Sequence, residues 1–137
     1  MRYFLITIII FFASCIEANK KISSELIDNG AEISVLGEDI FNFGEIVQGE
    51  KIDVEFLIKN TGDGDLIISD VNTSCGCTVP SWPNHVIKKG VTEKVRVSFN
   101  SEGKIGPQSR KVTLQTNATP SIKILTITGT VIVPKNQ

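Results

Sequence analysis

Apolar and polar residues alternate along four separate segments of the chain, 51–59, 94–99, 111–114 and 122–133. Alternation with a period of two places every second side chain on the same face of an extended strand. Each segment therefore predicts a strand with one buried and one solvated face. From residue 15 onward the chain has 16 Ile, 12 Val and 10 Thr but only 3 Ala. Because β-branched residues favour strands, we predict an all-β domain over residues 31–137.

Turn-forming residues separate the predicted strands at intervals of about 8 to 12 residues. The clearest is segment 60–65, Asn-Thr-Gly-Asp-Gly-Asp, whose residues tolerate a positive φ. Further breaks fall at 82–84, 88–90, 100–103 and 117–120. About seven short strands divided in this way predict an antiparallel β-sandwich.

The same pattern predicts which side chains form the core. Phe41 and Phe43 share one face of a strand, so both are expected to be buried, with Gly44 permitting a bend behind them. The other expected core residues are Ile52, Val54, Phe56, Ile58, Val95, Val97, Phe99, Val112 and Leu114.

Residues 1–14 predict a signal peptide that is removed on export. Arg2 precedes the apolar run 4–12, which is much shorter than the about 20 residues that cross a bilayer. The residues Ala13-Ser14-Cys15 then resemble a bacterial lipobox, in which the cysteine is lipidated and becomes the mature N-terminus. Phe12 stands where that motif usually has leucine. The alternative is an ordinary signal peptide followed by an incidental cysteine.

Lipidation of Cys15 would hold the protein at a membrane, because each acyl CH₂ in the bilayer contributes about 0.8 kcal/mol. Residues 15–30 contain no aromatic residue and end in Asn29-Gly30, which is typical of a tether. Ile16 stands where an aspartate would resemble an inner-membrane retention signal. We therefore expect the bacterial cell envelope, with the outer membrane favoured and the periplasmic or surface side left open.

Charge and composition exclude several functional classes. The chain has 14 Lys and Arg, 15 Asp and Glu and one His, which gives a formal net charge of −1. This balance, without a basic cluster, argues against a nucleic-acid partner. One histidine cannot supply a His-rich metal site, and the sequence has no Ser-His-Asp signature or Gly-rich phosphate loop. We expect no cofactor, and no enzymatic activity other than disulfide exchange.

Several segments, taken in order, resemble a known family. They are 41–46 with 49–51, 56–62, 66–68, 71–80 and 125–131. Together they are similar to the bacterial immunoglobulin-like domain family of unknown function marked by a Ser-Cys-Gly-Cys-Thr motif, which is similar in plan to Hydin-type and major-sperm-protein-type domains. The resemblance covers roughly residues 40–133, with Lys89-Gly90 where the family usually has Pro-Gly. It implies an immunoglobulin-like fold and an exported protein, and no established activity.

The segment Cys75-Gly76-Cys77, with His85 eight residues further on, is the candidate site for chemistry. Alternate residues of a strand point to one face, so we expect both cysteines on a short strand near Trp82. Pro80 and Pro83 donate no ladder hydrogen bond, so we expect this segment to be a sheet edge or to leave the sheet.

Four interpretations of this pair remain open. A disulfide suits an oxidising exported location, but extended i, i+2 Cα atoms lie about 6.5 Å apart, so the bond requires a bend. The two thiolates could bind Cu(I), with His85 as a third ligand. They could exchange disulfides with a partner protein. They could also be inert side chains that pack beneath Trp82.

Two functional hypotheses follow. The first is a lipid-anchored binding or structural module, joined to the membrane through Cys15 and acting on a protein partner of unknown identity. The second is a thiol-redox or Cu(I)-handling protein that uses Cys75 and Cys77. The state of the two sulfur atoms distinguishes the hypotheses.

Overall fold

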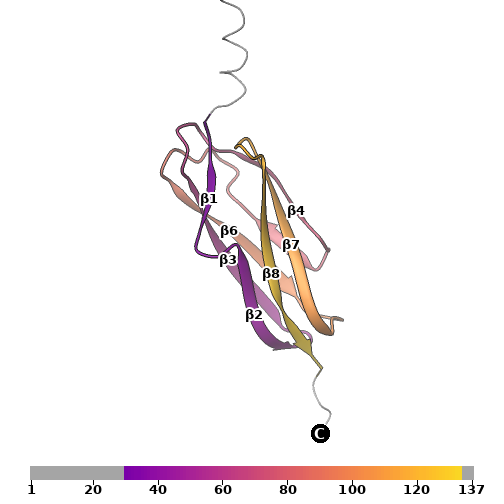
Figure 1. The fold of residues 1–137 in the computed structure, drawn as a ribbon. Helices are drawn as coiled ribbons and strands as arrows, with labels where there is room; N and C mark the ends of the chain where they lie inside the picture. Colours follow the sequence, from indigo (N-terminus) through magenta and orange to yellow (C-terminus); the bar gives the residue numbers. More distant parts are fainter. Residues whose placement is uncertain (1–29, 134–137) are drawn as a thin grey trace, which may run out of the picture.

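The computed structural model of the chain describes residues 30–133, which form two β-sheets packed face to face (Figure 1). The sheets have the strand orders β1-β3-β6-β5 and β2-β8-β7-β4. The prediction of an all-β sandwich is confirmed. The eight strands are β1 (Ile33–Leu36), β2 (Ile40–Val47), β3 (Lys51–Asn60), β4 (Ile68–Thr73), β5 (Thr78–Ser81), β6 (Thr92–Asn100), β7 (Gly106–Thr116) and β8 (Ile122–Ile132).

The described part of the chain contains no helix long and apolar enough to cross a membrane. The predicted signal peptide 1–14, the lipidation site Cys15 and the tether up to residue 29 lie outside the described residues.

The sandwich has eight strands rather than about seven because the first extended segment divides between the two sheets. Gly37 has a φ of +100°, a conformation that glycine adopts easily, and the chain changes sheets there. β1 pairs antiparallel with β3, whereas β2 pairs parallel with β8. The β2–β8 pairing is therefore parallel. The alternation of apolar and polar residues does not predict the relative direction of two strands.

The core lies between the two sheets and follows the predicted alternation. On β3, Val54, Phe56 and Ile58 are buried, while the residues between them face solvent. Ile52 is only partly buried and packs against this cluster. The other predicted core residues of β6 and β7 are all buried, namely Val95, Val97, Phe99, Val112 and Leu114.

β2 departs from the predicted burial because it is an edge strand. Phe41 remains 41% exposed, so the prediction that both phenylalanines are buried is wrong for this residue. Phe43 is partly buried and stacks on Phe99 of β6, with ring centroids 5.6 Å apart. Gly44, at a φ of +71°, lies inside the register shift between Asn42 and Glu45 and provides the predicted bend.

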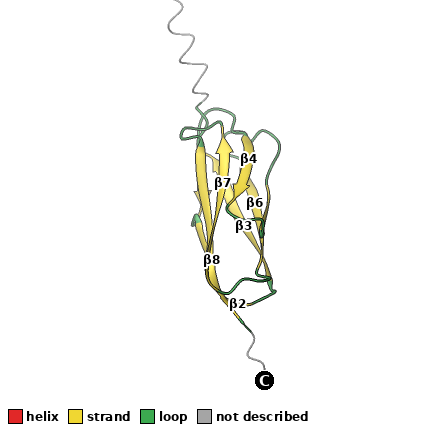
Figure 2. Cartoon of the chain, turned by 90° about the vertical axis from the view of Figure 1, so that its right-hand side faces the viewer, coloured by secondary structure: helices red, strands yellow, loops and turns green. Residues whose placement is uncertain are grey.

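The described domain begins and finishes at opposite ends of the sandwich, where the loops also gather (Figures 1 and 2). At the first end, the amide of Gly64 donates to the carbonyl of Gly30 (3.1 Å) and that of Thr61 donates to Glu32 (3.0 Å). At the other end, the amide of Ser101 donates to the carbonyl of Glu50 (3.0 Å). We call these the Gly30 end and the Glu50 end.

Candidate functional site

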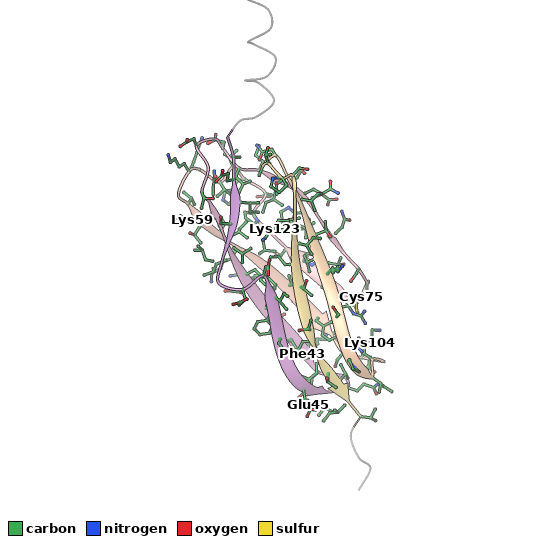
Figure 3. The ribbon with its side chains drawn as sticks, viewed as in Figure 1. Phe43, Glu45, Lys59, Cys75, Lys104 and Lys123 are labelled. Carbon is green, nitrogen blue, oxygen red and sulfur yellow. A yellow bond between two sulfur atoms is a disulfide. The ribbon has the colours of Figure 1, made fainter. Side chains whose placement is uncertain are left out.

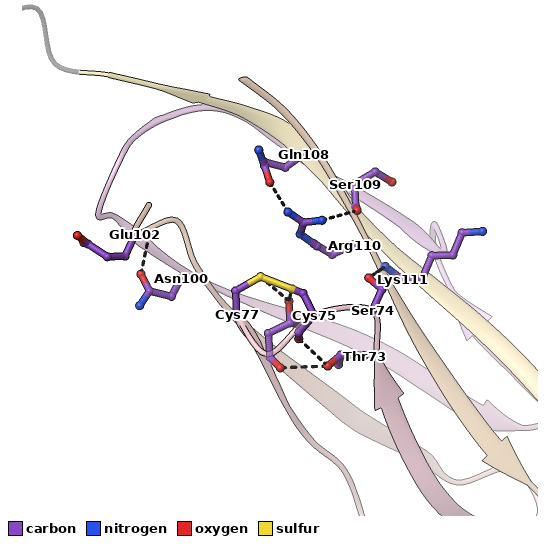
Figure 4. Close-up of a disulfide and its surroundings, with 11 residues drawn as sticks. Thr73, Ser74, Cys75, Cys77, Asn100, Glu102, Gln108, Ser109, Arg110 and Lys111 are labelled. Carbon is purple, nitrogen blue, oxygen red and sulfur yellow. Dashed lines mark hydrogen bonds between the residues drawn. A yellow bond between two sulfur atoms is a disulfide. The ribbon is translucent and has the colours of Figure 1, made fainter. Parts of the chain in front are cut away.

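Cys75 and Cys77 lie in the connection between β4 and β5 and are joined by a disulfide (Figure 4). Their Cα atoms are 5.3 Å apart, closer than the about 6.5 Å of an extended strand. The prediction that both residues stand on a strand is therefore wrong, because the chain turns at Gly76 and β5 starts only at Thr78. The prediction of a sheet edge is confirmed, since β5 pairs with β6 alone.

Hydrogen bonds that do not involve sulfur hold this turn on both sides. The hydroxyl of Thr73 donates to the carbonyl of Cys75 (3.0 Å), and the amide of Asn100 donates to the carbonyl of Cys77 (3.0 Å). Ser74 and Lys111 exchange two further bonds, Ser74 N to Lys111 O (3.0 Å) and Lys111 N to Ser74 Oγ (3.1 Å). The turn is thus fixed to β6 on one side and to β7 on the other.

The two sulfur atoms have different surroundings. The hydroxyl of Thr78 lies 3.4 Å from Sγ of Cys75 and 4.0 Å from Sγ of Cys77. Since neither sulfur of a disulfide carries a proton, only the hydroxyl can donate here, and its shorter contact is with Cys75. Thr78 is only 4% exposed, so water competes little for this hydroxyl.

A permanent positive charge also lies in the surroundings of the disulfide (Figure 4). Arg110 precedes Lys111 on β7 and, like Val112 two residues on, faces the other sheet. Its guanidinium donates to the Gln108 side chain and to the Ser109 carbonyl. Its Nε is buried and has no hydrogen-bond partner among the described residues.

A hollow of about 410 Å³ opens beside Cys77. Its walls include Gly76 of the turn, Lys51 of β3, and Ser98 and Asn100 of β6. Cys77 and Gly76 line this hollow, whereas Cys75 is directed to the Thr78 side of the turn. The site is therefore a half-buried disulfide with one of its cysteines, Cys77, beside an open space.

A family model described as a protein of unknown function, DUF1573, matches residues 34–131 of this chain. The chain belongs to this family. No curated protein matches it.

Solved structures are similar to the DUF1573 domain in fold. A protein of unknown function from Porphyromonas gingivalis W83 has a TM-score of 0.64 at 16% identity, covering 73% of this chain and 46% of that one. This chain thus spans about half the length of that protein. The ASH/PapD-like domain 7 of human CEP192 has a TM-score of 0.60 at 11% identity, covering 80% and 89%. The VesB protease of Vibrio cholerae has a TM-score of 0.56 at 14% identity, covering 76% and 32%. At such identities these likenesses show the fold alone, a PapD-like, immunoglobulin-type sandwich.

The DUF1573 domain does not bring His85 to the cysteine pair. Nε2 of His85 lies 3.0 Å from Oε1 of Glu93, near the start of β6, whereas Cys77 bonds to Asn100 at the end of that strand. Seven residues of strand separate the two places by about 23 Å. Within residues 30–133 no three His, Cys, Asp or Glu side chains come together as ligands for a metal ion. His85 is thus not a third ligand beside Cys75 and Cys77 in this structure.

Trp82 and Cys77 line different hollows. Trp82 packs against the core and borders a second hollow with Ile68, Ser69 and Asn84, between the edge strands β4 and β5. The interpretation in which the cysteines pack beneath this ring is therefore not supported by the arrangement of these residues.

Sequence reasoning missed Thr78 and Arg110 as neighbours of the disulfide. A usable signal was present for the arginine. On β7 the inward positions run Gln108, Arg110, Val112 and Leu114, so a charged residue falls where the alternation calls for an apolar one. Burial of an unpaired charge is costly, so a charged residue on the inner face of a predicted strand indicates either a functional site or the edge of the core.

Proposed function

We propose that this DUF1573 protein is exported to the bacterial cell envelope, cleaved before Cys15 and lipidated there, and that its sandwich is a binding module for another protein. The apolar run 4–12 and the residues Ala13-Ser14-Cys15 support the anchor. The neutral charge balance and the immunoglobulin-type fold support a protein partner rather than a nucleic acid. The outer membrane is the favoured location because Ile16 follows the cysteine.

The observation that carries this proposal is the placement of the two ends of the sandwich. The chain enters the sandwich at the Gly30 end, and β3, which begins beside Glu50 and finishes at Asn60, joins the two ends over ten residues, roughly 30 Å. Cys75 and Lys104 lie nearer to the Glu50 end, whereas Lys59 lies at the Gly30 end (Figure 3). A lipid on Cys15 would therefore leave the Glu50 end directed away from the bilayer.

The Glu50 end also exposes apolar side chains. Ile105, in the loop before β7, is 66% exposed, and Ile132 and Val133 at the end of β8 are also exposed. Apolar side chains at the free end of a tethered domain are suited to contact another protein.

Membrane fractionation tests the anchor. Cys15→Ala is expected to release the protein from membranes or leave it as an uncut precursor. The matched control replaces Cys75 and Cys77 together by alanine, which removes the same chemical group elsewhere and should leave fractionation unchanged. Processing and membrane retention of Cys15→Ala at the level of the native sequence would contradict the lipid anchor.

Site-specific photo-crosslinking tests the binding end. A photoreactive residue at position 105 is expected to give a discrete cross-linked protein, and the same residue at the exposed Val91, at the Gly30 end, is expected to give none. Equal cross-linking from both positions, or none from position 105, would contradict binding at the Glu50 end.

Thiol–disulfide exchange is a second candidate function, favoured by the small size of the ring. A disulfide that joins residues only two positions apart in the sequence constrains the unfolded chain weakly, so stabilisation alone explains its presence poorly. A Cu(I)-handling version would rest on the two thiolates of the reduced pair, without His85. Incubation of the folded protein with glutathione buffers tests this function, and a disulfide that stays closed in them would contradict it.

A further inference from the structure

We infer that the Cys75–Cys77 disulfide opens in one direction: the thiolate of a partner protein's dithiol attacks Sγ of Cys77, and Cys75 leaves as the thiolate. This inference rests on the second candidate function above and assigns a role to each of its two sulfurs.

Access distinguishes the sulfurs first. Thiolate attack requires approach along the line of the S–S bond, from the side opposite the leaving sulfur. Cys77 borders the hollow of about 410 Å³, which is large enough to receive a cysteine side chain with its neighbours. Apart from its neighbours Cys75 and Cys77, Gly76 has no heavy atom within 4 Å of the place where a Cβ would stand, so no other segment crowds the turn at this point. An incoming thiolate therefore reaches Cys77 through open space.

The leaving sulfur is distinguished by its hydrogen-bond donor. The Thr78 hydroxyl is 0.6 Å closer to Cys75 than to Cys77, at 3.4 Å against 4.0 Å. A hydroxyl that donates to a thiolate stabilises the charged form, and burial of Thr78 strengthens this effect. Negative charge is therefore better accommodated on Cys75 as the S–S bond breaks.

Arg110 adds an electrostatic contribution from the β7 side. Its guanidinium remains protonated, and its buried Nε has a hydrogen-bonding capacity that no described residue uses. A cation beside a thiolate lowers the free energy of that thiolate. Arg110 therefore stabilises the Cys75 thiolate through its charge alone and forms no bond with the partner.

The exchange balances in two steps. In the first, the partner's thiolate forms a bond to Sγ of Cys77, the Cys75–Cys77 bond breaks, and its electron pair goes to Sγ of Cys75. In the second, the partner's other thiolate attacks the partner sulfur that is bonded to Cys77. A disulfide forms within the partner, and Cys77 leaves as the thiolate. The partner's dithiol is oxidised to a disulfide by two electrons, and Cys75 and Cys77 are reduced and take up two protons.

The turn is built to keep the two thiols together after this reaction. The hydrogen bonds that Thr73, Asn100 and Lys111 donate are accepted by backbone carbonyls and a hydroxyl of the turn. None of them involves sulfur, so they do not depend on the S–S bond. The two thiols consequently stay close to one another in the folded domain after the exchange.

Trapping of the first mixed disulfide tests the direction of opening, with reduced glutathione as the probe. Every variant carries Cys15→Ala, so that only the pair reacts. The reaction is quenched with acid within the first turnovers, free thiols are alkylated, and peptides are mapped by mass spectrometry. We expect glutathione on Cys77 and the alkyl group on Cys75, in about tenfold excess over the reverse pattern. Glutathione mainly on Cys75, or equally on both, would overturn the direction while leaving the exchange function intact. No opening at all would overturn the exchange function itself.

Variants of the donor and of the cation test the physical cause. Thr78→Val removes the hydroxyl at nearly constant volume and is expected to slow opening about tenfold. Thr78→Ser retains the hydroxyl and should restore the rate. Thr128→Val makes the same replacement on β8, away from the turn, and should leave the rate unchanged. Equal rates for Thr78→Val and Thr78→Ser would overturn the assigned role of the hydroxyl.

A pH titration separates this electrostatic role from a merely structural one. In the Cys77→Ser chain the remaining Cys75 thiol is expected to be half ionised at a lower pH than Cys77 is in the Cys75→Ser chain, as read from thiolate absorbance. Arg110→Met should move the Cys75 midpoint upward by about one pH unit and leave that of Cys77 less affected. Identical midpoints for the two cysteines would overturn the assignment.

Discussion

The ring of Phe43 occupies the space that a side chain at position 129 would need. A Cβ built on Gly129 would stand 2.1 Å from Cε2 of Phe43 and 2.6 Å from its Cγ. The same ring stacks on Phe99 of the opposite sheet. Gly129 of β8 therefore allows an edge-strand phenylalanine to reach across the sandwich, so this glycine and this ring form one packing unit.

Replacement of this glycine is expected to displace the ring. Gly129→Ala should lower the free energy of unfolding by about 1–3 kcal/mol, because the methyl group and the ring cannot both keep their places. Urea denaturation measures the change. Combining Gly129→Ala with Phe43→Ala should cost less than the sum of the two single changes, since the clash is then absent. Gly76→Ala is the control, because a Cβ there meets no atom within 4 Å. Additive effects in the double variant would contradict the shared packing.

Asn60 is expected to be the most sensitive polar residue of the Gly30 end. It is fully buried, and its amide donates to the carbonyls of Gly64 (2.7 Å) and Ile87 (2.9 Å) while its Oδ1 accepts from the amide of Gly62 (3.0 Å). Asn60→Ala leaves these groups unsatisfied, which should cost about 2–4 kcal/mol. Thermal unfolding measures the loss, and Asn84→Ala on the surface should shift the midpoint little. Similar shifts for the two variants would contradict this role.

Reduction of the disulfide should leave the domain folded. A ring that contains only three residues removes little entropy from the unfolded chain, so the loss of stability should be about 1–2 kcal/mol. Urea denaturation with and without a reductant measures it, and near-ultraviolet circular dichroism reports on the packing of the core. The Cys75→Ser, Cys77→Ser double variant, which lacks the bond under both conditions, is the control. Cooperative unfolding lost on reduction would show that the bond holds the fold.

Glu55 should make the stability of the domain depend on acid pH. Hydrogen bonds from Lys94 and then Arg96 hold the pKa of Glu55 below its usual value of 4.5. A carboxylate whose pKa is lowered by folding contributes stability above that usual value, and the contribution is lost as the pH falls through the lowered value. Glu55→Gln should therefore destabilise the protein at neutral pH and have no such effect at about pH 2.

Urea midpoints across this pH range, measured for Glu55→Gln and the native sequence, test this dependence. Glu45→Gln on β2, for which the described residues show no ion pair, is the control. The effect should be small because both cationic partners are solvent-exposed. A difference between Glu55→Gln and the native sequence that persists unchanged at low pH would contradict the assigned cause.

Sequence reasoning succeeded where a residue's surroundings depend only on the face of its own strand. Phe56, Val97 and Leu114 were predicted to be buried because they alternate with polar residues, and all three are buried. It failed for Phe41, since an exposed sheet edge depends on which strands become neighbours, and β2 pairs only with the distant β8.

The cysteine turn shows the same limit. The spacing of Cys75 and Cys77 indicated that the sulfurs start close together, but the donors that fix the turn come from Asn100 and Lys111, far along the chain. His85 seemed near in sequence and lies at the other end of β6, because the extended path of a strand separates nearby residues quickly.

The parallel pairing of β2 with β8 has a mechanical consequence. A pull that reaches the start of β2 at Ile40, opposed by a pull at Val133, loads β2 from its first residue and β8 from its last. The two strands are then forced to slide along one another, and the hydrogen bonds between Ile40–Val47 and their partners resist together rather than opening one at a time. A domain connected in this way bears tension along its long axis and yields far more readily to a force that peels β1 sideways from β3.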